Sequence, residues 1–399
     1  MSKRTIVLWQ AVLALFLGGF TTYSLLYCTQ PLLPIFSAYF NVSPTVASLS
    51  LSVAIAGVIL GMLITPKLSK RWGRKRVMSV ALASAAILEG AAALSPYYEL
   101  FLVVRSLQGL VLAGFPANAM AYVMEEFPPH QAGTIMGLYI SGTAVGGMMG
   151  RLAAGWLTAW YSWQVAMLVL AACGAFAAIW FIFSLPGSQN QGGQGGETLG
   201  LLESLQRAVT ERQLLYLYLC GFLIMGAFVT LFNYMSYLLM ADPYGLSTAD
   251  IGTLFLLNAI GTVIAPLAGR LTALYSHAKV LAGGIVLMLL GCLVTLAATF
   301  GIKVVGMIVF SGAFAANHAT ISGWVGRCAT FDKAQASAWY LTFYYAGSVV
   351  AGTAGGLFWS LYGWSGVIAM IAILLIVALA IVMREPTWRT ADNRTVHLP

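Results

Sequence analysis

The amino-acid sequence predicts an all-α membrane protein with twelve transmembrane helices arranged as two six-helix pseudo-repeats. Three observations lead to this prediction: the composition, the distribution of positive charge and an internal repeat. Of the 399 residues, 60% are hydrophobic and 8% are charged, and the mean hydropathy is +0.86. Soluble domains carry about 25% charged residues, and here apolar runs recur without polar faces, so a soluble core is excluded.

One short basic segment sets the expected orientation in the membrane. Residues 67–76 (KLSKRWGRKR) hold six of the twenty Lys and Arg residues and lie between the apolar runs 44–65 and 77–95. Each run can cross the ~30 Å hydrocarbon core as a helix, and a short basic loop remains on the cytoplasmic side. Seventeen Lys and Arg residues then fall in cytoplasmic regions, and only Lys303 falls in an outer loop. Both termini are therefore expected in the cytoplasm, with an even number of spans.

Local signals predict where helices begin and break. Pro31 and Pro34 predict a break or kink near the outer end of the first span, and Ser43-Pro44 predicts the N-cap and first position of the second. The expected spans are about 5–38, 44–65, 77–95, 98–124, 131–159 and 163–185 in the first half, and about 211–240, 247–274, 278–300, 302–328, 333–361 and 364–384 in the second.

A polar stretch rich in Gly and Gln interrupts the apolar pattern near the middle of the chain. Such a composition predicts a flexible linker. The expected domains are a six-helix bundle at 1–185, a cytoplasmic linker at 186–210, a second bundle at 211–385 and a cytoplasmic tail at 386–399.

The two halves repeat at a nearly constant offset. At a shift of 201 residues, five aromatic or glycine positions coincide: Tyr139 with Tyr340, Gly146 with Gly347, Gly155 with Gly356, Tyr161 with Tyr362, and Trp163 with Trp364. At a shift of 199, Phe115 and Asn118 meet Phe314 and Asn317. Two parallel halves of six spans are typical of transporters with a midplane site.

Several motifs then show a family resemblance. Gly73-Arg74-Lys75-Arg76 is similar to the end of a loop 2–3 signature, and Arg105-Ser106-Leu107-Gln108-Gly109 matches the R-x-x-Q-G motif of span 4. The glycines near position 146 resemble a motif of span 5 in antiporters: Gly142, Gly146, Gly147 and Gly150. With these motifs the chain resembles the major facilitator superfamily over nearly its whole length, and within it the twelve-span drug and sugar efflux group. Leu26–Pro31, Gly137–Gly142 and Phe228–Tyr234 are similar to YnfM-type inner-membrane transporters.

The sequence departs from the family pattern at three places. Pro66 and Lys70 stand where the loop 2–3 signature has a glycine and an aspartate, and Gly147 stands where span 5 usually has a proline. In the family the aspartate helps to latch the halves in the outward-facing state, so this latch is not carried over. Gly73 and Arg74 remain as expected conformational residues.

Three charged residues within apolar segments are the first site candidates, and Glu89 and Arg105 are the candidates for proton coupling; the third is Arg151. Ionised groups there usually face a partner or a cavity. Glu89 and Arg105 lie at similar depths in spans 3 and 4, so they could pair. The pair could tie helices together, or Arg105 could tune a proton-carrying group or meet the substrate.

His318 and three acidic residues complete the coupling candidates. His318 shares a helix face with Ser311, Phe314 and Ser322, and could carry a proton, contact substrate or simply be a hydrogen-bonded helix residue. Glu126 is also a candidate, although the favoured interpretation of the acids at cytoplasmic ends, which are Glu125, Glu126 and Asp332, is a solvated cap.

Polar and aromatic residues at mid-depth are the expected substrate contacts, although each could instead bind a neighbouring helix. Such an uncharged lining would suit an amphipathic or polyhydroxylated compound better than a strongly anionic one. The candidates are Tyr23, Tyr27 and Gln30 in span 1, Thr230, Asn233 and Tyr237 in span 7, Asn118 in span 4, Asn317 in span 10 and Tyr344 in span 11.

Two glycine stripes predict close helix packing in spans 5 and 11. Their members are spaced by four or five residues: Gly142, Gly146 and Gly150, and Gly347, Gly352 and Gly356. Small residues at this spacing let helices approach closely. We expect these stripes to pack against the opposite half and to slide as the carrier switches.

The sequence predicts a secondary active transporter, and not an enzyme, that exports a drug, sugar or metabolite by proton antiport. No G-x-x-x-x-G-K-[ST] or H-E-x-x-H motif occurs, so ATP drive and zinc hydrolysis are unsupported, and the five scattered cysteines indicate no metal site. The expected partners are a small-molecule substrate, protons and the lipid bilayer, without cofactor or nucleic acid, for a monomer in the bacterial cytoplasmic (inner) membrane. The alternatives are an uncoupled facilitator or importer of the same fold, and a non-transporting membrane sensor.

Overall fold

The computed structural model describes residues 3–187, 201–330 and 332–384. Within these ranges the chain is all-helical, without a β-strand. Ten helical stretches of the described residues are long and apolar enough to cross a membrane. They omit α7 (Pro129–Trp160) and count α15 (Lys333–Arg384) once, although Gly363 at φ 58° and ψ −146° divides α15 into two helices. With α7 included and α15 counted as two, the twelve expected spans are present.

The expected break in the first span occurs where its prolines predict it. The span divides into α1 (Lys3–Tyr27), the 3-10 turn η1 (Gln30–Leu32) and α2 (Leu33–Phe40). A proline has no N–H to donate and its ring crowds the preceding turn, so Pro31 and Pro34 stand at helix starts. The other helices of this half are α3 (Pro44–Trp72), α4 (Arg74–Ala93), α5 (Tyr98–Leu112), α6 (Pro116–Glu126) and α8 (Trp163–Ser184).

The second half begins inside the expected linker. Residues 201–210 form the helix α9 (Leu201–Thr210), while most of the Gly- and Gln-rich stretch, 188–200, lies outside the described residues. The remaining elements are α10 (Arg212–Met240), α11 (Thr248–Leu254), the 3-10 turn η2 (Phe255–Ala259), α12 (Ile260–Leu274), α13 (His277–Val294) and α14 (Phe300–Cys328).

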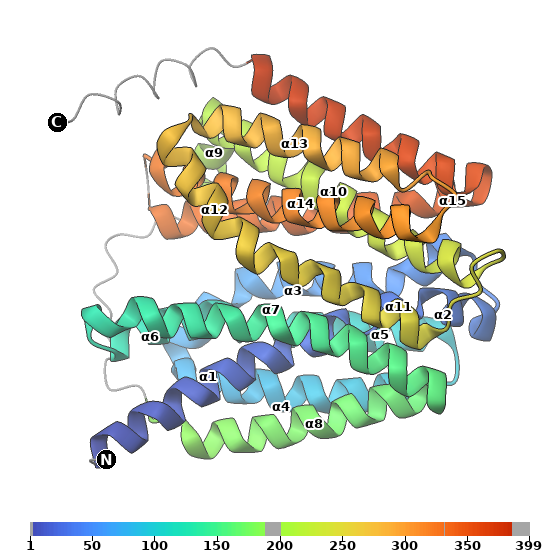
Figure 1. Cartoon of the computed structure of the whole chain (residues 1–399). Coiled ribbons are helices and arrows are strands. Elements are labelled where there is room, and N and C mark those ends of the chain that lie inside the picture. Colours follow the sequence, from blue (N-terminus) through green and yellow to red (C-terminus); the bar gives the residue numbers. More distant parts are fainter. Residues whose placement is uncertain (1–2, 188–200, 331, 385–399) are drawn as a thin grey trace. The chain divides into compact units, whose positions relative to one another are not determined.

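The chain forms two compact units by its internal contacts. The first unit comprises residues 1–195 and 239–256, and the second comprises 196–238 and 257–399. The expected bundles therefore differ from the contact-based units at 239–256, a segment that includes α11. Within the first unit α11 packs against α7. Figure 1 shows both helices side by side.

The same helix contact recurs in both units, as the internal repeat predicts. In the first unit a Cβ added to Gly146 of α7 would clash with the backbone of Phe20 in α1. In the second unit a Cβ added to Gly347 of α15 would clash with the backbone of Phe222 in α10. The two phenylalanines are 202 residues apart and the two glycines are 201 residues apart, so the two units share nearly the same helix contact.

These contacts correct the expected role of the glycine stripes. Gly142, Gly146 and Gly150 pack on α1 within their own unit, and Gly347 and Gly352 pack on α10. Spacing of small residues shows that a helix is closely approached but not by which neighbour. The glycine of α7 that meets the second half of the sequence is Gly155, whose added Cβ would lie 2.9 Å from Cα of Gly252 in α11.

Two local features define the ends of α3. Ser43 caps its N-terminus, as predicted, by accepting a hydrogen bond from the Val46 amide at 3.3 Å. Gly73 alone separates α3 from α4, at φ 81° and ψ 150°. An L side chain rarely adopts this conformation, so glycine suits the one-residue turn.

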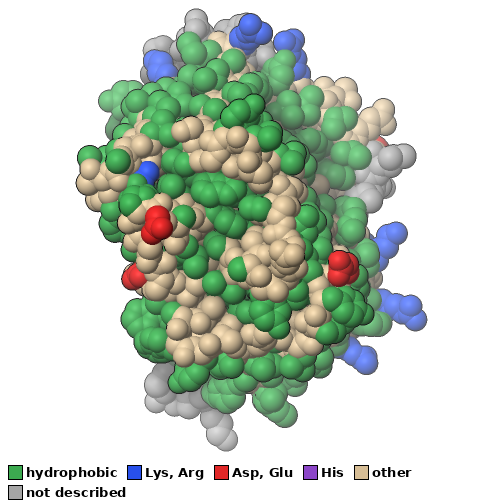
Figure 2. All heavy atoms as spheres, turned by 90° about the vertical axis from the view of Figure 1, so that its right-hand side faces the viewer, with side chains coloured by type: hydrophobic (Ala, Val, Ile, Leu, Met, Phe, Trp, Pro, Cys, Tyr) green, Lys and Arg blue, Asp and Glu red, His purple; other side chains and the backbone are tan. Residues whose placement is uncertain are grey.

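Few charged side chains lie on the surface around α2 and α11 of the first unit. Figure 2 views the right-hand side of Figure 1, where α2 and α11 lie, and hydrophobic or uncharged side chains predominate there. Lys303, the residue expected in an outer loop, instead lies in the first turn of α14 and is 3% exposed. Its ammonium group donates to the Thr295 carbonyl at 2.7 Å, beside the end of α13.

Candidate functional site

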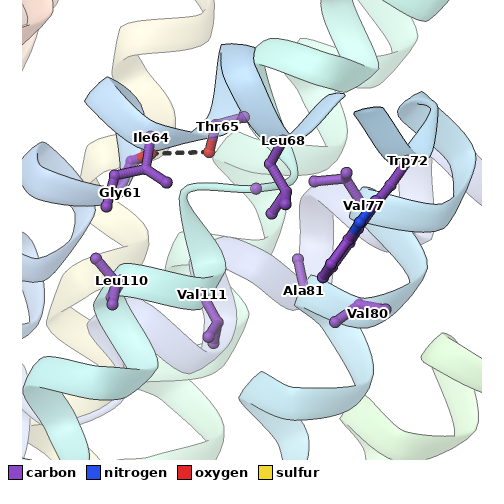
Figure 3. Close-up of a pocket in the computed structure, with 11 residues that line it drawn as sticks. Gly61, Ile64, Thr65, Leu68, Trp72, Val77, Val80, Ala81, Leu110 and Val111 are labelled. Atoms are coloured by element: carbon purple, nitrogen blue, oxygen red, sulfur yellow. Dashed lines mark hydrogen bonds between the residues drawn. The ribbon is translucent and has the colours of Figure 1, made fainter. Parts of the chain in front are cut away.

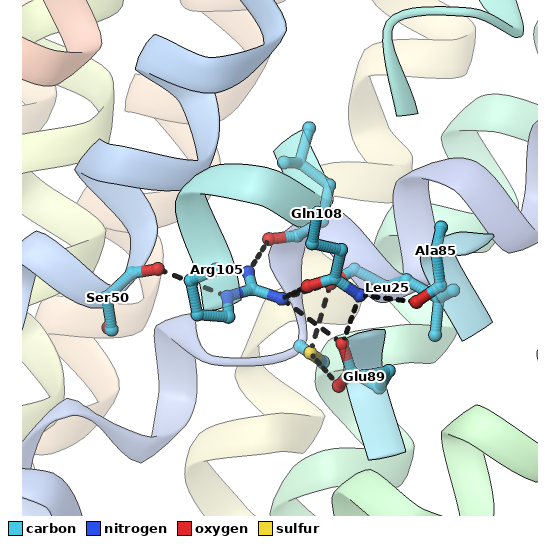
Figure 4. A network of polar contacts seen from close by, with 8 residues as sticks. Leu25, Ser50, Ala85, Glu89, Arg105 and Gln108 are labelled. Atoms are coloured by element: carbon cyan, nitrogen blue, oxygen red, sulfur yellow. Dashed lines mark hydrogen bonds and ion pairs between the residues drawn. The ribbon is translucent and has the colours of Figure 1, made fainter. Parts of the chain in front are cut away.

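A buried ion pair joins α4 and α5, as the depths of its members in the sequence predicted. Arg105 Nη1 lies 3.2 Å from Glu89 Oε2, and both side chains are 0% exposed. The same guanidinium donates to carbonyls of other helices: to Leu25 at 3.0 Å, to Leu26 at 2.8 Å and to Ser50 at 3.3 Å. Figure 4 shows Arg105 between these groups. The pair thus ties together α1, α3, α4 and α5.

Gln108 and Cys28 complete this network. Gln108 Nε2 donates to Glu89 Oε2 at 2.6 Å and to the Ala85 carbonyl at 3.0 Å, and its Oε1 accepts from Arg105. Cys28 Sγ donates to Glu89 Oε1 at 3.1 Å. The R-x-x-Q-G motif therefore places Arg105 and Gln108 on one helix face, where both hold the same carboxylate. The roles of Gln108 and Cys28 were not predicted, although the motif itself marked Gln108.

Arg151 gathers two of the predicted substrate residues. Its Nε donates to Gln30 Oε1 at 2.7 Å, and its Nη1 donates to the Gly147 carbonyl at 2.7 Å. The guanidinium carbon lies 4.2 Å from the ring centroid of Tyr27 and 5.0 Å from that of Phe255. Aromatic faces attract cations at such distances.

The Arg151 cluster consists of Arg151, Tyr27, Gln30 and Phe255. It contacts both sides of the break in the first span, since Tyr27 ends α1 and Gln30 begins η1. Tyr23 stacks on Tyr27 with ring centroids 6.1 Å apart, so all three predicted residues of span 1 are linked to it. Arg151 is 8% exposed. The sequence marked Arg151 as a charged residue within span 5 but did not indicate its role. The contact with Phe255, which is 104 residues further along the chain, had no sequence signal.

His318 lies in an aromatic cluster of the second unit. A hydrogen bond of 2.8 Å joins His318 Nδ1 and the hydroxyl of Tyr340. The ring of Tyr344 lies 4.6 Å from that of His318, and the ring of Phe314 lies 6.2 Å away in a stacked orientation. Phe314 in turn stacks on Phe228 at 3.9 Å. The structure brings the predicted residues His318 and Tyr344 together, and it adds Tyr340, whose match to Tyr139 was the only sequence signal.

The predicted face of span 7 packs against α15. Thr230 donates to the Gly226 carbonyl of its own helix at 2.8 Å, and an added Cβ at Gly352 would lie 3.4 Å from Asn233 Nδ2. The ring of Tyr237 lies 5.8 Å from that of Trp359. Contact with another helix was the alternative for these residues, and their role as substrate contacts stays a prediction.

The two matching asparagines also contact neighbouring helices. Asn118 Oδ1 accepts from Ser69 Oγ at 2.6 Å, and its Nδ2 donates to the Gly114 carbonyl at 2.8 Å. Asn317 faces α13, where its amide nitrogen donates to the Leu281 carbonyl at 3.2 Å and its amide oxygen accepts from the Ile285 amide at 3.2 Å. Both side chains are at most 2% exposed, so their amides serve helix contacts in this state.

Glu125, near the end of α6, forms an ion pair with Arg74. Arg74 Nε donates to Glu125 Oε2 at 2.7 Å, and Arg74 Nη2 lies 2.5 Å from Glu125 Oε1. Glu125, expected as a solvated cap, is thus a partly exposed residue that binds Arg74 through both carboxylate oxygens. Lys70 replaces the family aspartate, yet Arg74 of the same loop keeps an acidic partner. Glu126, the next residue, ends α6 and its coupling role stays untested.

Comparison with known proteins agrees with this fold and these motifs. The family model for the Major Facilitator Superfamily matches residues 15–265 and 217–397. A Bacillus subtilis (strain 168) protein named "Uncharacterized MFS-type transporter YybF" is 41% identical over 94% of this chain and 93% of its own length. The "Inner membrane transport protein YnfM" of Escherichia coli (strain K12) is 41% identical over 93% of this chain and 89% of its own.

Solved structures show the same architecture at low sequence identity. A point mutant of the nucleoside transporter NupG superposes with a TM-score of 0.78 at 15% identity, over 94% of this chain and 99% of that one. The xylose transporter XylE from E. coli, in a partially occluded inward open conformation, gives a TM-score of 0.73 at 13% identity, over 96% and 98% of the two chains. At such identities the likeness supports the fold alone.

Proposed function

Because the chain belongs to the Major Facilitator Superfamily, we propose that it exports a small organic compound in exchange for protons. The chain is a multi-pass membrane transporter. The proposal adds the bacterial cytoplasmic membrane as its location, both termini in the cytoplasm, a monomeric state and the proton gradient as the driving force in place of a cofactor. The scarcity of Lys and Arg outside the expected cytoplasmic regions supports this orientation.

The buried carboxylate Glu89 carries the proposal of proton coupling. It lies within the membrane segment, it is 0% exposed, and Arg105 and Gln108 hold one of its oxygens. A carboxylate can carry one proton across a membrane without a cofactor, and such intramembrane acids mark proton relays. When Glu89 takes up a proton it becomes neutral, and Arg105 loses the negative charge of its partner.

The route from proton to substrate runs through the broken first span. Arg105 bonds the carbonyls of Leu25 and Leu26, and Glu89 accepts from Cys28. Leu25, Leu26 and Cys28 are neighbours of Tyr27 and Gln30 in the chain. Both Tyr27 and Gln30 contact Arg151. Protonation of Glu89 would weaken the hold on the end of α1 and so alter the surroundings of Arg151. A break between α1 and α2 supplies a place where such a change can be absorbed.

The proposed substrate contacts form one set in each unit. In the first unit these are Tyr23, Tyr27 and Gln30, and in the second unit the aromatic cluster of His318 and Tyr344 is best placed. Aromatic faces, an amide and an imidazole can bind apolar surface and hydroxyl groups together. An amphipathic or polyhydroxylated compound fits this lining.

Transport in proteoliposomes tests the proposal directly. The purified protein is reconstituted with a pH-sensitive dye inside and challenged with panels of sugars, drugs and metabolites. We expect one class of compound to trigger proton movement in the wild type. Glu89→Gln should abolish that proton movement while retaining exchange of labelled for unlabelled substrate, because it removes the titratable group and keeps the shape.

A matched control separates coupling from a general effect of charge. Glu99, an exposed acid in the first turn of α5, is changed to Gln in the same way and should leave proton movement intact. Substrate-triggered proton movement in Glu89→Gln at the wild-type level would overturn the assignment of Glu89. His318→Gln is then the next variant, since His318 is the other titratable group near a predicted substrate residue.

One observation favours a second candidate, an uncoupled facilitator. The Glu89 network is so well hydrogen-bonded that it could serve only to join four helices. In that case substrate would flow down its gradient without any proton movement, and a pH difference would not drive accumulation. Absence of flux for every compound would instead favour a membrane sensor that keeps the carrier fold.

A further inference from the structure

A groove opens between α3, α4 and α5 in the first unit. Its volume is about 180 Å³, and its walls are apolar: Ile64, Leu68, Trp72, Val80, Leu110 and Val111. Figure 3 shows these side chains pointing into the space from the three helices. The groove has no role in the network of Glu89 or in the Arg151 cluster.

The groove exists because α3 and α4 diverge from a one-residue turn. Gly73 joins the two helices, and each of them packs on α5. At the floor α3 approaches α5 so closely that a Cβ added to Gly61 would meet Ala113 Cβ at 2.6 Å. Gly114 of the same floor lies near Ala81 of α4, where an added Cβ would be 3.1 Å away. Small residues thus make a shallow floor under large apolar walls.

The walls are exposed at the surface of a membrane segment. Ile64 is 53% exposed, Val80 is 44% exposed and Trp72 is 43% exposed. Ile64 and Val80 lie in the apolar runs 44–65 and 77–95, where exposed side chains face lipid tails and not water, and Trp72 lies next to them in the basic segment, at the level of the headgroups. The chemistry of the walls therefore selects a hydrocarbon chain, and it offers almost nothing to a water-soluble ligand.

Positive charge gathers where the groove ends. The guanidinium carbon of Arg76 lies 5.9 Å from the ring centroid of Trp72, which lines the groove. Lys67, Lys70 and Arg71 on the last turns of α3 are exposed. Arg74 is different, since it binds Glu125. Lys70 replaces the aspartate of the family signature, so this end carries more positive charge than the signature implies.

We propose that this groove holds one acyl chain of an anionic phospholipid, whose phosphate is bound by Arg76 and the exposed basic residues of the 67–76 segment. A cluster of four to eight Lys and Arg beside the cytoplasmic end of a transmembrane helix attracts anionic headgroups. The groove adds a site for one tail, so charge and shape select the same molecule. The occupant is a lipid of the cytoplasmic leaflet and not a transported compound.

Quenching of Trp72 by brominated lipids tests this site. The full-length protein is reconstituted in phosphatidylcholine vesicles containing phosphatidylglycerol, and bromine is placed on the tails of either lipid at equal mole fraction. The signal of Trp72 is the difference between wild type and Trp72→Phe, because the chain has 11 tryptophans. We expect brominated phosphatidylglycerol to quench this signal more strongly, and the preference to fall as salt is raised.

Two pairs of variants assign the preference to the groove. Arg76→Gln should lower the preference for phosphatidylglycerol by about fivefold, the effect of one basic residue near an anionic surface. Its matched control is Arg270→Gln, which changes an exposed arginine of α12 outside the groove. Ile64→Phe should fill the groove and reduce quenching of Trp72 by both lipids, whereas Ile87→Phe, at an exposed apolar position on α4, should not.

Three outcomes would overturn the site. Equal quenching of Trp72 by the two lipids would show bulk lipid only. An unchanged preference in Arg76→Gln, or an equal loss in Arg270→Gln, would show attraction by net charge without a site. The first of these outcomes needs only the wild type and Trp72→Phe, so it does not depend on the folding of the charge or groove variants.

Discussion

At the scale of single residues, the pairing of Arg105 with Glu89 gives a prediction for the stability of the protein. Removing one member of a buried ion pair leaves an uncompensated charge and costs about 3–5 kcal/mol. We therefore expect Arg105→Met and Glu89→Leu each to lower the thermal stability of the protein in detergent strongly. The double variant should be more stable than the sum of the single effects predicts, since it leaves no isolated charge. Strictly additive effects in this cycle would show that the pair contributes little.

Arg151 gives a second prediction at this scale. A lysine keeps the positive charge but lacks the planar fork that contacts Gln30, Gly147 and the rings of Tyr27 and Phe255 together. Arg151→Lys should raise the KM for the transported compound by about tenfold or more, as expected when a charge-assisted hydrogen bond of roughly 1.5–3 kcal/mol is lost. Initial rates in proteoliposomes measure this. An unchanged KM would remove Arg151 from the substrate site and leave it a helix contact.

At the scale of elements, the close packing of α7 on α1 can be tested with two glycines of one helix. A Cβ at Gly146 would clash with the backbone of Phe20, whereas nothing lies within 4 Å of a Cβ at Gly137. Gly146→Ala should destabilise the protein and reduce transport, because the helices must separate. Gly137→Ala should be neutral or stabilise by roughly 0.5–1 kcal/mol, since alanine favours the helix. Thermal unfolding of the two variants decides this, and equal behaviour would contradict the packing.

At the scale of the whole molecule, the architecture was easier to predict from the sequence than the contacts between side chains. Hydropathy and the charge of the loops were sufficient to predict the membrane spans, because the bilayer requires helices of a certain length and favours basic loops on one side. The Glu89–Arg105 pair was predictable from depth in adjacent spans. The partners of Gly146, Asn118 and Arg151 were not, since neither helix spacing nor composition identifies which face of which neighbour is met. Function still depends on those partners, so the sequence indicates a class of transporter and not its substrate.

The contact of α11 with α7 provides the last prediction, which concerns transport by alternating access. In the sequence α11 belongs to the second half, yet its contacts place it in the first unit, where Trp156 Nε1 donates to Thr253 Oγ1 at 2.9 Å. If access to the substrate site alternates, some contacts between the two sequence halves must break during each cycle.

Trp156→Cys with Thr253→Cys, in a background where Cys173 and Cys328 are serine, allows a short reducible thiol cross-linker to hold this contact. Cross-linking should stop transport, and reduction should restore it. Each single cysteine variant treated with the same reagent is the control. Full transport by the cross-linked protein would mean that α11 and α7 move together throughout the cycle, and the moving contact would then have to be sought elsewhere.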